Sequence, residues 1–194
     1  MQINFLKKQG FKNFLILTKK NNLQIKREIN KKNKKKIRIN IHPEKIKLGT
    51  GGAIKNALSK LNNCFGVIYG DSWLDIDFKK INHLYFKSKN SCLITAISKK
   101  LVNHKPNLLI KKKKILKYSK ENFSKNNYIE YGYQIFNKKV FSTINQKVFD
   151  LNLVLNNLIK LDDVEVIFIK KRFYEIGSLN GIKQFKKHIE DING

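Results

Sequence analysis

The stretch LGTGGAIKNAL, Leu48–Leu58, decides the fold that we expect for this chain. Its glycine-rich turn opens a helix over residues 51–61, whose apolar residues recur at helical spacing, and Thr50 can cap that helix. An apolar strand, Phe65–Tyr69, follows directly. A helix that leads into a buried strand is one unit of a layered α/β sheet.

The same alternation of strand and helix continues on both sides of this unit. Further strands are expected at 14–17, 37–41, 92–97, 131–136 and 164–169. Further helices are expected at 3–9, 23–29, 78–85, 151–159 and 182–192. Two short apolar runs, 108–110 and 115–118, indicate a small hairpin insert. We therefore expect a mostly parallel sheet with helices on its faces.

Length and composition fit a single domain. The 194 residues are 41% apolar, which is enough for a sizeable core. No stretch approaches the roughly 20 apolar residues of a membrane helix, and the first residues lack the plan of a secretory signal. Cys64 and Cys92 show no metal-ligand spacing, so we expect buried free thiols. These features favour a cytoplasmic protein with no membrane partner.

The formal net charge of +27 raises the question of a nucleic-acid partner. Clustered cations neutralise phosphates, but only Arg27, Arg38 and Arg172 are arginine, the residue that best reads base edges. Lysine, asparagine and isoleucine are abundant together, which indicates a coding bias toward A/T-rich codons. Charge runs such as 31–36 are typical of exposed loops. We therefore expect no nucleic-acid partner.

The glycine-rich turn at Leu48–Leu58 has two interpretations. Glycines let a ligand approach the backbone closely, and a helix N-terminus offers N–H groups to phosphates. Many helices without ligands begin in the same way, so a purely structural turn is an equal alternative.

Two strand ends deliver carboxylates beside glycines. Asp71 follows the apolar strand in VIYGDS, and Glu175 lies in RFYEIGS. Because ligands bind outside the carboxyl ends of strands in open α/β sheets, the two acids could share one Mg²⁺. The alternative for Asp71 is a cap on the following turn, and for the other two acids the preferred interpretation is that Asp75 or Asp77 caps the next helix.

In their order, LGTGGAIKNAL, YGDSWLDIDF, YIEYGYQIF and RFYEIGSLNGIKQF resemble the sugar-1-phosphate nucleotidyltransferases. The resemblance covers nearly the whole chain. It implies a Rossmann-like three-layer sandwich of the nucleotide-diphospho-sugar transferase type, with Mg²⁺ as cofactor. It also implies a reaction in which a sugar 1-phosphate and a nucleoside triphosphate give a nucleotide-sugar and pyrophosphate.

The resemblance further implies roles for individual residues. Gly49, Thr50, Gly51 and Gly70 would contact the nucleotide, with the base meeting the first two. Asp71 would be catalytic and would hold the metal.

For the rest of the site, the resemblance implies that Glu175 completes the metal site, although aspartate is commoner at this position. Lys120 aligns with a lysine that binds the sugar phosphate, and it would be catalytic together with Asp71. Glu130 and Gly132 would line the sugar pocket.

Members of this family open with a strand, a G-x-G-x-R-L loop and a downstream lysine, and these 194 residues contain no such motif. We therefore expect residues 1–194 to form an N-terminally truncated domain that lacks its first strand and is a poor catalyst alone. A mis-called start, a split gene or a decayed remnant would each explain this. Two alternatives stay open: a non-catalytic remnant that binds nucleotide or sugar phosphate, and, ranked last, a basic nucleic-acid-binding module.

Overall fold

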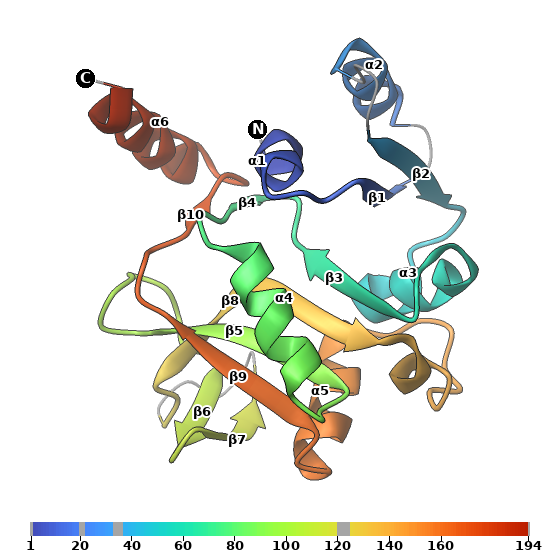
Figure 1. Cartoon of the computed structure of the whole chain (residues 1–194), viewed down its shortest axis with the longest axis vertical. Helices are drawn as coiled ribbons and strands as arrows, with labels where there is room; N and C mark the ends of the chain where they lie inside the picture. The colour runs from blue at the N-terminus through green and yellow to red at the C-terminus, as the bar shows by residue number, and fades with distance from the viewer. Residues whose placement is uncertain (1, 20–21, 33–36, 120–124, 194) are drawn as a thin grey trace.

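The computed structural model describes residues 2–19, 22–32, 37–119 and 125–193, and strands alternate with helices through most of them (Figure 1). The helices are α1 (Gln2–Lys8), α2 (Leu23–Lys32), α3 (Gly49–Asn56), α4 (Phe78–Lys87), α5 (Leu151–Lys160) and α6 (Leu179–Asn193), with short 3₁₀ turns η1 (Leu58–Lys60) and η2 (Lys138–Phe141). The strands are β1 (Asn13–Lys19), β2 (Arg38–Glu44), β3 (Cys64–Ile68), β4 (Ser72–Trp73), β5 (Cys92–Ser98), β6 (Leu108–Lys111), β7 (Lys114–Tyr118), β8 (Tyr128–Asn137), β9 (Val164–Ile169) and β10 (Tyr174–Glu175).

The central sheet is built around β8. Its order is β7-β6-β8-β5-β9, and β3 pairs with β8 as well. Gln134 of β8 lies between Ile94 of β5 and Val67 of β3, so β5 covers one edge of β8 and β3 covers part of the other. The antiparallel pair β6–β7 is the hairpin insert that the sequence predicts.

The pairing in this sheet is mixed, which corrects the expectation of a mostly parallel sheet. β5 and β9 are parallel, but β8 is antiparallel to β3, β5 and β6. β3, β5 and β9 therefore share one direction, and β8 runs between two of them in the opposite one. The reason is topological: β8 follows the hairpin, and among the described residues no crossover helix, which parallel neighbours require, lies between β5 and β8.

Two apolar cores cover the two faces of the sheet, which gives the expected three layers. Along β5, Cys92 and Ile94 face the core under α3 and α5, whereas Leu93 and Ile97 face the core under α4 and α1. This alternation follows from the two-residue period of a strand. Figure 1 shows α4 on the near face and α5 behind the sheet.

β1 and β2 form a separate two-stranded parallel sheet. Its side chains still reach the main body, because Phe14 packs against the core under α4, and Leu17 packs against the core under α5. In the described part of the chain, β1 has no strand partner besides β2, and β3 has none besides β8.

Both cysteines are free thiols, as the sequence predicts. Cys92 is buried, and burial raises the pKa of its thiol. Cys64 is only half-buried and lies 3.7 Å from the Tyr85 hydroxyl. None of the helices in the described ranges is long and apolar enough to cross a membrane.

Candidate active site

The glycine-rich turn packs against the backbone just before α5. The N–H groups of Gly51 and Gly52 both donate to the carbonyl oxygen of Phe149 at 3.0 Å. Gly49 has a φ of +74°, and a Cβ there would lie 2.5 Å from the same oxygen. A Cβ on Gly51 would overlap the Phe149 ring. These glycines are therefore required by packing, and a phosphate cannot use the N–H groups of Gly51 and Gly52 without displacing Phe149.

Thr50 does not cap α3, contrary to the sequence-based expectation. The helix begins at Gly49, and Leu48 in the cap position makes no side-chain hydrogen bond. The Thr50 hydroxyl instead accepts from the N–H of Leu151 at 2.9 Å and lies 3.4 Å from Asp150 Oδ1. Thr50 thus caps α5 from a distance of 101 positions in the chain, and the N-termini of α3 and α5 meet.

A bulge in β8 carries two of the predicted site residues. Opposite Thr95, the register of β5 and β8 shifts, and Gly132 has a φ of +107°. The Thr95 hydroxyl donates to Tyr133 O at 2.7 Å, and Glu130 Oε1 accepts from the N–H of Gly132 at 2.7 Å. Glu130 is buried, and it fixes the bulge with one of its oxygens.

Polar side chains from four elements gather beside this bulge. Burial first, and then the negative charge of Glu130, raise the pKa of both Tyr69 and Tyr118. Asp150 raises the pKa of each tyrosine further. Both phenols therefore remain neutral O–H groups at physiological pH. Gln134 is the fifth member, with its Nε2 3.5 Å from the Tyr69 hydroxyl. We call Tyr69, Tyr118, Glu130, Gln134 and Asp150 the polar cluster.

Asp71 and Glu175 lie next to each other, as the sequence predicts. A Cβ on Gly177 would lie 2.8 Å from Glu175 Oε1 and 3.5 Å from Asp71 Oδ2, so both carboxylates flank one point. The backbone holds them there, because the N–H of Ile176 donates to Asp71 O at 2.6 Å and β4 pairs with β10.

The way the two acids meet differs from the expectation. Asp71 lies in the turn between β3 and β4, and Glu175 lies in β10, which is antiparallel to β4. They are therefore brought together by a short two-stranded ribbon rather than by adjacent strand ends of the main sheet. Two hydroxyls accompany them: Ser178 Oγ donates to Glu175 Oε2 at 3.0 Å, and Ser72 Oγ lies 3.4 Å from Asp71 Oδ1.

Four further residues were predicted to bind a ligand or to cap a helix. Gly70 lies between Tyr69 of the polar cluster and Asp71, and nothing lies within 4 Å of a Cβ built on it. Lys120 lies outside the described residues. Asp77 accepts from the N–H of Lys80 at 2.9 Å and caps α4, as the sequence predicts. Asp75 forms an ion pair with Lys171 instead of capping a helix.

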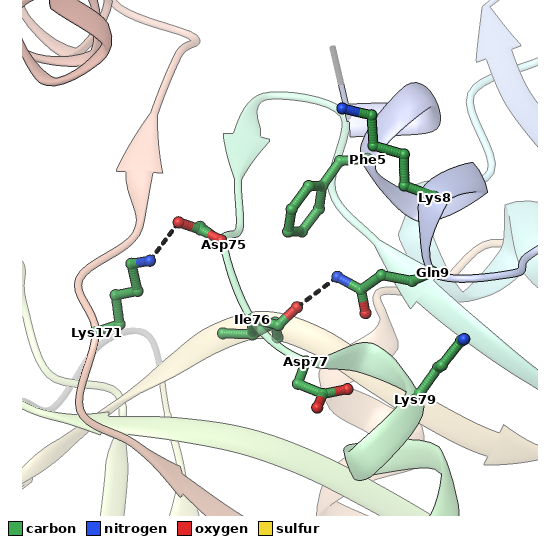
Figure 2. Close-up of a pocket in the computed structure, with 8 residues that line it drawn as sticks. All are labelled: Phe5, Lys8, Gln9, Asp75, Ile76, Asp77, Lys79 and Lys171. Carbon is green, nitrogen blue, oxygen red and sulfur yellow. Dashed lines mark hydrogen bonds and ion pairs between the residues drawn. The ribbon is translucent and has the colours of Figure 1, made fainter. Parts of the chain in front are cut away.

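A separate cavity of about 530 Å³ lies between α1 and the start of α4 (Figure 2). It is lined by Phe5, Lys8, Gln9, Asp75, Ile76, Asp77, Lys79 and Lys171. Several of its polar groups already have structural uses, because Asp75 pairs with Lys171 and Gln9 Nε2 donates to Ile76 O at 2.8 Å. None of the residues predicted to bind nucleotide, sugar or metal lines it.

Four members of the polar cluster were not predicted from the sequence: Tyr69, Tyr118, Gln134 and Asp150. Asp150 carried one local signal, since it is an acidic residue directly before an apolar helix. Gln134 stands in an apolar strand, and its polarity there was the other available clue.

A layered α/β fold with hydroxyls and carboxylates gathered beyond strand ends is typical of nucleotide-binding proteins. The comparison with family models is more specific. The model of the Nucleotidyl transferase family matches residues 1–191, so this chain belongs to that family.

A D-glycero-alpha-D-manno-heptose 1-phosphate guanylyltransferase of Campylobacter jejuni is 40% identical over 77 residues, which are 40% of this chain and 34% of that protein. HddC from Yersinia pseudotuberculosis complexed with GMP-PN has a TM-score of 0.79 at 22% identity, over 97% of this chain and 83% of that chain. A putative glucose-1-phosphate thymidylyltransferase from Bacillus anthracis has a TM-score of 0.83 at 16% identity, over 94% of this chain and 78% of that chain. The structural matches confirm the expected α/β fold.

Proposed function

We propose that this domain transfers a nucleotidyl group from a nucleoside triphosphate to a sugar 1-phosphate. A phosphate oxygen of the sugar 1-phosphate attacks the α-phosphorus, the bond between that phosphorus and the β-phosphate oxygen breaks, and pyrophosphate leaves. Family membership supports the reaction class. The observation that carries the proposal is that Asp71 and Glu175 flank one point and that Tyr69, two residues before Asp71, belongs to the polar cluster.

Mg²⁺ is the cofactor that we propose, and the donors fit it. Asp71, Glu175 and the neighbouring Ser178 offer oxygen atoms only, which are the ligands that magnesium prefers. Within the described residues, no group of three or more His, Cys, Asp or Glu side chains is placed to hold a metal ion. Magnesium commonly takes one or two carboxylates and fills its shell with water and substrate phosphates. When bound, it would neutralise charge on the phosphate oxygens.

Different residues of the protein bind the nucleotide and the sugar 1-phosphate. We propose that the base of the nucleotide meets Gly49 and Thr50 at the start of α3, since a glycine lets a flat ligand approach the backbone closely. The sugar lies at Glu130 and Gly132, where the buried carboxylate can accept hydrogen bonds from hydroxyl groups. Lys120 remains our proposed contact for the sugar phosphate.

The Campylobacter relative makes GTP and D-glycero-α-D-manno-heptose 1-phosphate the first substrate pair to test. GTP binding is measured by titration calorimetry with and without Mg²⁺. We expect Asp71→Asn and Glu175→Gln each to weaken Mg²⁺-dependent binding by about tenfold or more, because an amide lacks the ligand charge. Asp75→Asn is the matched control, since this carboxylate pairs with Lys171. Equal affinity in Asp71→Asn and the unchanged protein would contradict the proposal.

Turnover is tested separately, because these 194 residues contain no G-x-G-x-R-L loop. Loss of one preorganised donor to a transferring group typically slows a reaction on the order of 100-fold. We expect no pyrophosphate release above background from the 194-residue chain with Mg²⁺, nucleoside triphosphates and hexose or heptose 1-phosphates. A form extended upstream with the family's first strand and loop should gain activity and lose it with Asp71→Asn. Silence from the extended form would favour a non-catalytic binding protein.

A further inference from the structure

Gln134 is a polar residue in an apolar place. It stands in the middle of β8, between Val67 and Ile94, and it is completely buried. Its Oε1 has no hydrogen-bond partner among the described residues, and its Nε2 reaches only the Tyr69 hydroxyl, at the long distance of 3.5 Å. Exchanging the oxygen and nitrogen of this amide would instead leave the NH₂ group without a hydrogen-bond partner in the described part of the chain.

An unpaired buried amide destabilises a protein, and an apolar side chain of similar length would avoid this cost. The core on this face offers such an environment, since Phe136 and Ile94 flank Gln134 there. The fold alone therefore gives no reason for glutamine at this position. Within the described ranges, the one group that the Gln134 amide contacts by a hydrogen bond is the Tyr69 hydroxyl.

Because Gln134 Nε2 donates to the Tyr69 oxygen, the Tyr69 proton must point elsewhere. The hydroxyl stands in the polar cluster, where burial and then the negative charges of Glu130 and Asp150 raise the pKa of Tyr69. Two carboxylates repel a phosphate group, whereas phenols and carboxylates together suit the alternating donors and acceptors of a neutral polyol.

We propose that Gln134 is a positioning residue that holds the Tyr69 hydroxyl as a contact for a hydroxyl group of the sugar. Tyr69 touches the sugar, and Gln134 acts through Tyr69. This inference rests on the proposed function, because it assigns part of the acceptor specificity of the same site.

The test measures the affinity of the 194-residue chain for three ligands separately: D-glycero-α-D-manno-heptose 1-phosphate, α-D-glucose 1-phosphate and Mg²⁺-GTP. Tyr69→Phe and Gln134→Met each should weaken binding of the preferred sugar phosphate by roughly tenfold, the effect of one lost hydrogen bond to a ligand. Mg²⁺-GTP affinity should stay unchanged. The double variant should bind no more weakly than either single one, because both changes remove the same contact.

Thermal unfolding separates positioning from a structural role. Without ligand, Gln134→Met should melt at the same temperature or higher, since it removes an unpaired buried amide. The control is Tyr131→Phe, whose hydroxyl lies 3.4 Å from Arg172 O and whose ring packs in the opposite core, and it should bind both ligands normally.

Several outcomes would overturn the proposal. Unchanged sugar-phosphate affinity in Tyr69→Phe would do so, as would a Gln134→Met protein that melts lower and binds every ligand more weakly. Loss of GTP affinity alone would assign the contact to the ribose and contradict the sugar assignment. A chain that binds neither GTP nor any sugar phosphate would instead refute the proposed function, whereas GTP binding with normal sugar affinity in the variants refutes only this inference.

Discussion

Single glycines in the site differ in what they tolerate, although the sequence presents them alike. Gly51 is buried, with its Cα against the Phe149 ring, whereas Gly70 is exposed and has open space where a Cβ would stand. A side chain at position 51 would clash with its neighbours, whereas position 70 has room for one.

We expect Gly51→Ala to lower the free energy of unfolding by about 1–3 kcal/mol, the usual effect of overpacking a filled site. Gly70→Ala should change it by less than about 0.5 kcal/mol, as exposed substitutions do. Urea unfolding of the two variants beside the unchanged chain checks this. A neutral Gly51→Ala would mean that the turn and Phe149 pack more loosely than they do in this structure.

Among elements, the β6–β7 hairpin carries a turn that its sequence disfavours. Lys112 and Lys113 have φ values of 45° and 63°, in a left-handed region that asparagine and glycine adopt more easily. Lys111 and Lys114 stand opposite each other on its two strands, and Lys114 pairs with Asp162.

Replacing Lys112 with Asn and Lys113 with Gly should stabilise the protein by about 1 kcal/mol, because both residues fit a two-residue hairpin turn. Differential scanning calorimetry measures the shift in melting temperature. The double variant Lys45→Asn, Lys47→Asn removes two exposed charges outside the hairpin and is the control. If both double variants gain equally, relief of charge repulsion rather than turn geometry would be the cause.

On the scale of the whole molecule, the two sheets differ in protection from solvent. β5 is buried along most of its length and β8 nearly throughout, whereas β1 and β2 form a separate pair of mostly half-exposed residues, of which Phe14 and Leu17 pack against the cores. Two-stranded sheets are marginal without further packing.

Hydrogen exchange should therefore divide the chain. We expect amides of β5 and β8 to exchange slowest, through global unfolding, and those of β1 and β2 to exchange much faster through local opening. Mass spectrometry of peptides from the two regions reports this directly. Equal protection of Leu15 and Ile94 would show that the two sheets open as one cooperative unit.

Strand and helix periodicity determined most of the elements, because an apolar repeat of two or of three to four residues is a local property of the chain. It likewise indicated Asp71 and Glu175, since each acid stands beside a glycine near the end of a predicted strand. Pattern alone also indicated that Asp75 or Asp77 caps α4, because capping needs only the few residues that follow, and Asp77 is the one that does so.

Tertiary structure decided how these elements meet. The antiparallel entry of β8, the bulge opposite Thr95 and the contact of Thr50 with the start of α5 join residues that are far apart in the chain. No local repeat encodes such contacts, because they depend on which elements share a core. For the same reason, the buried amide of Gln134 gained a meaning only when Tyr69 was found beside it.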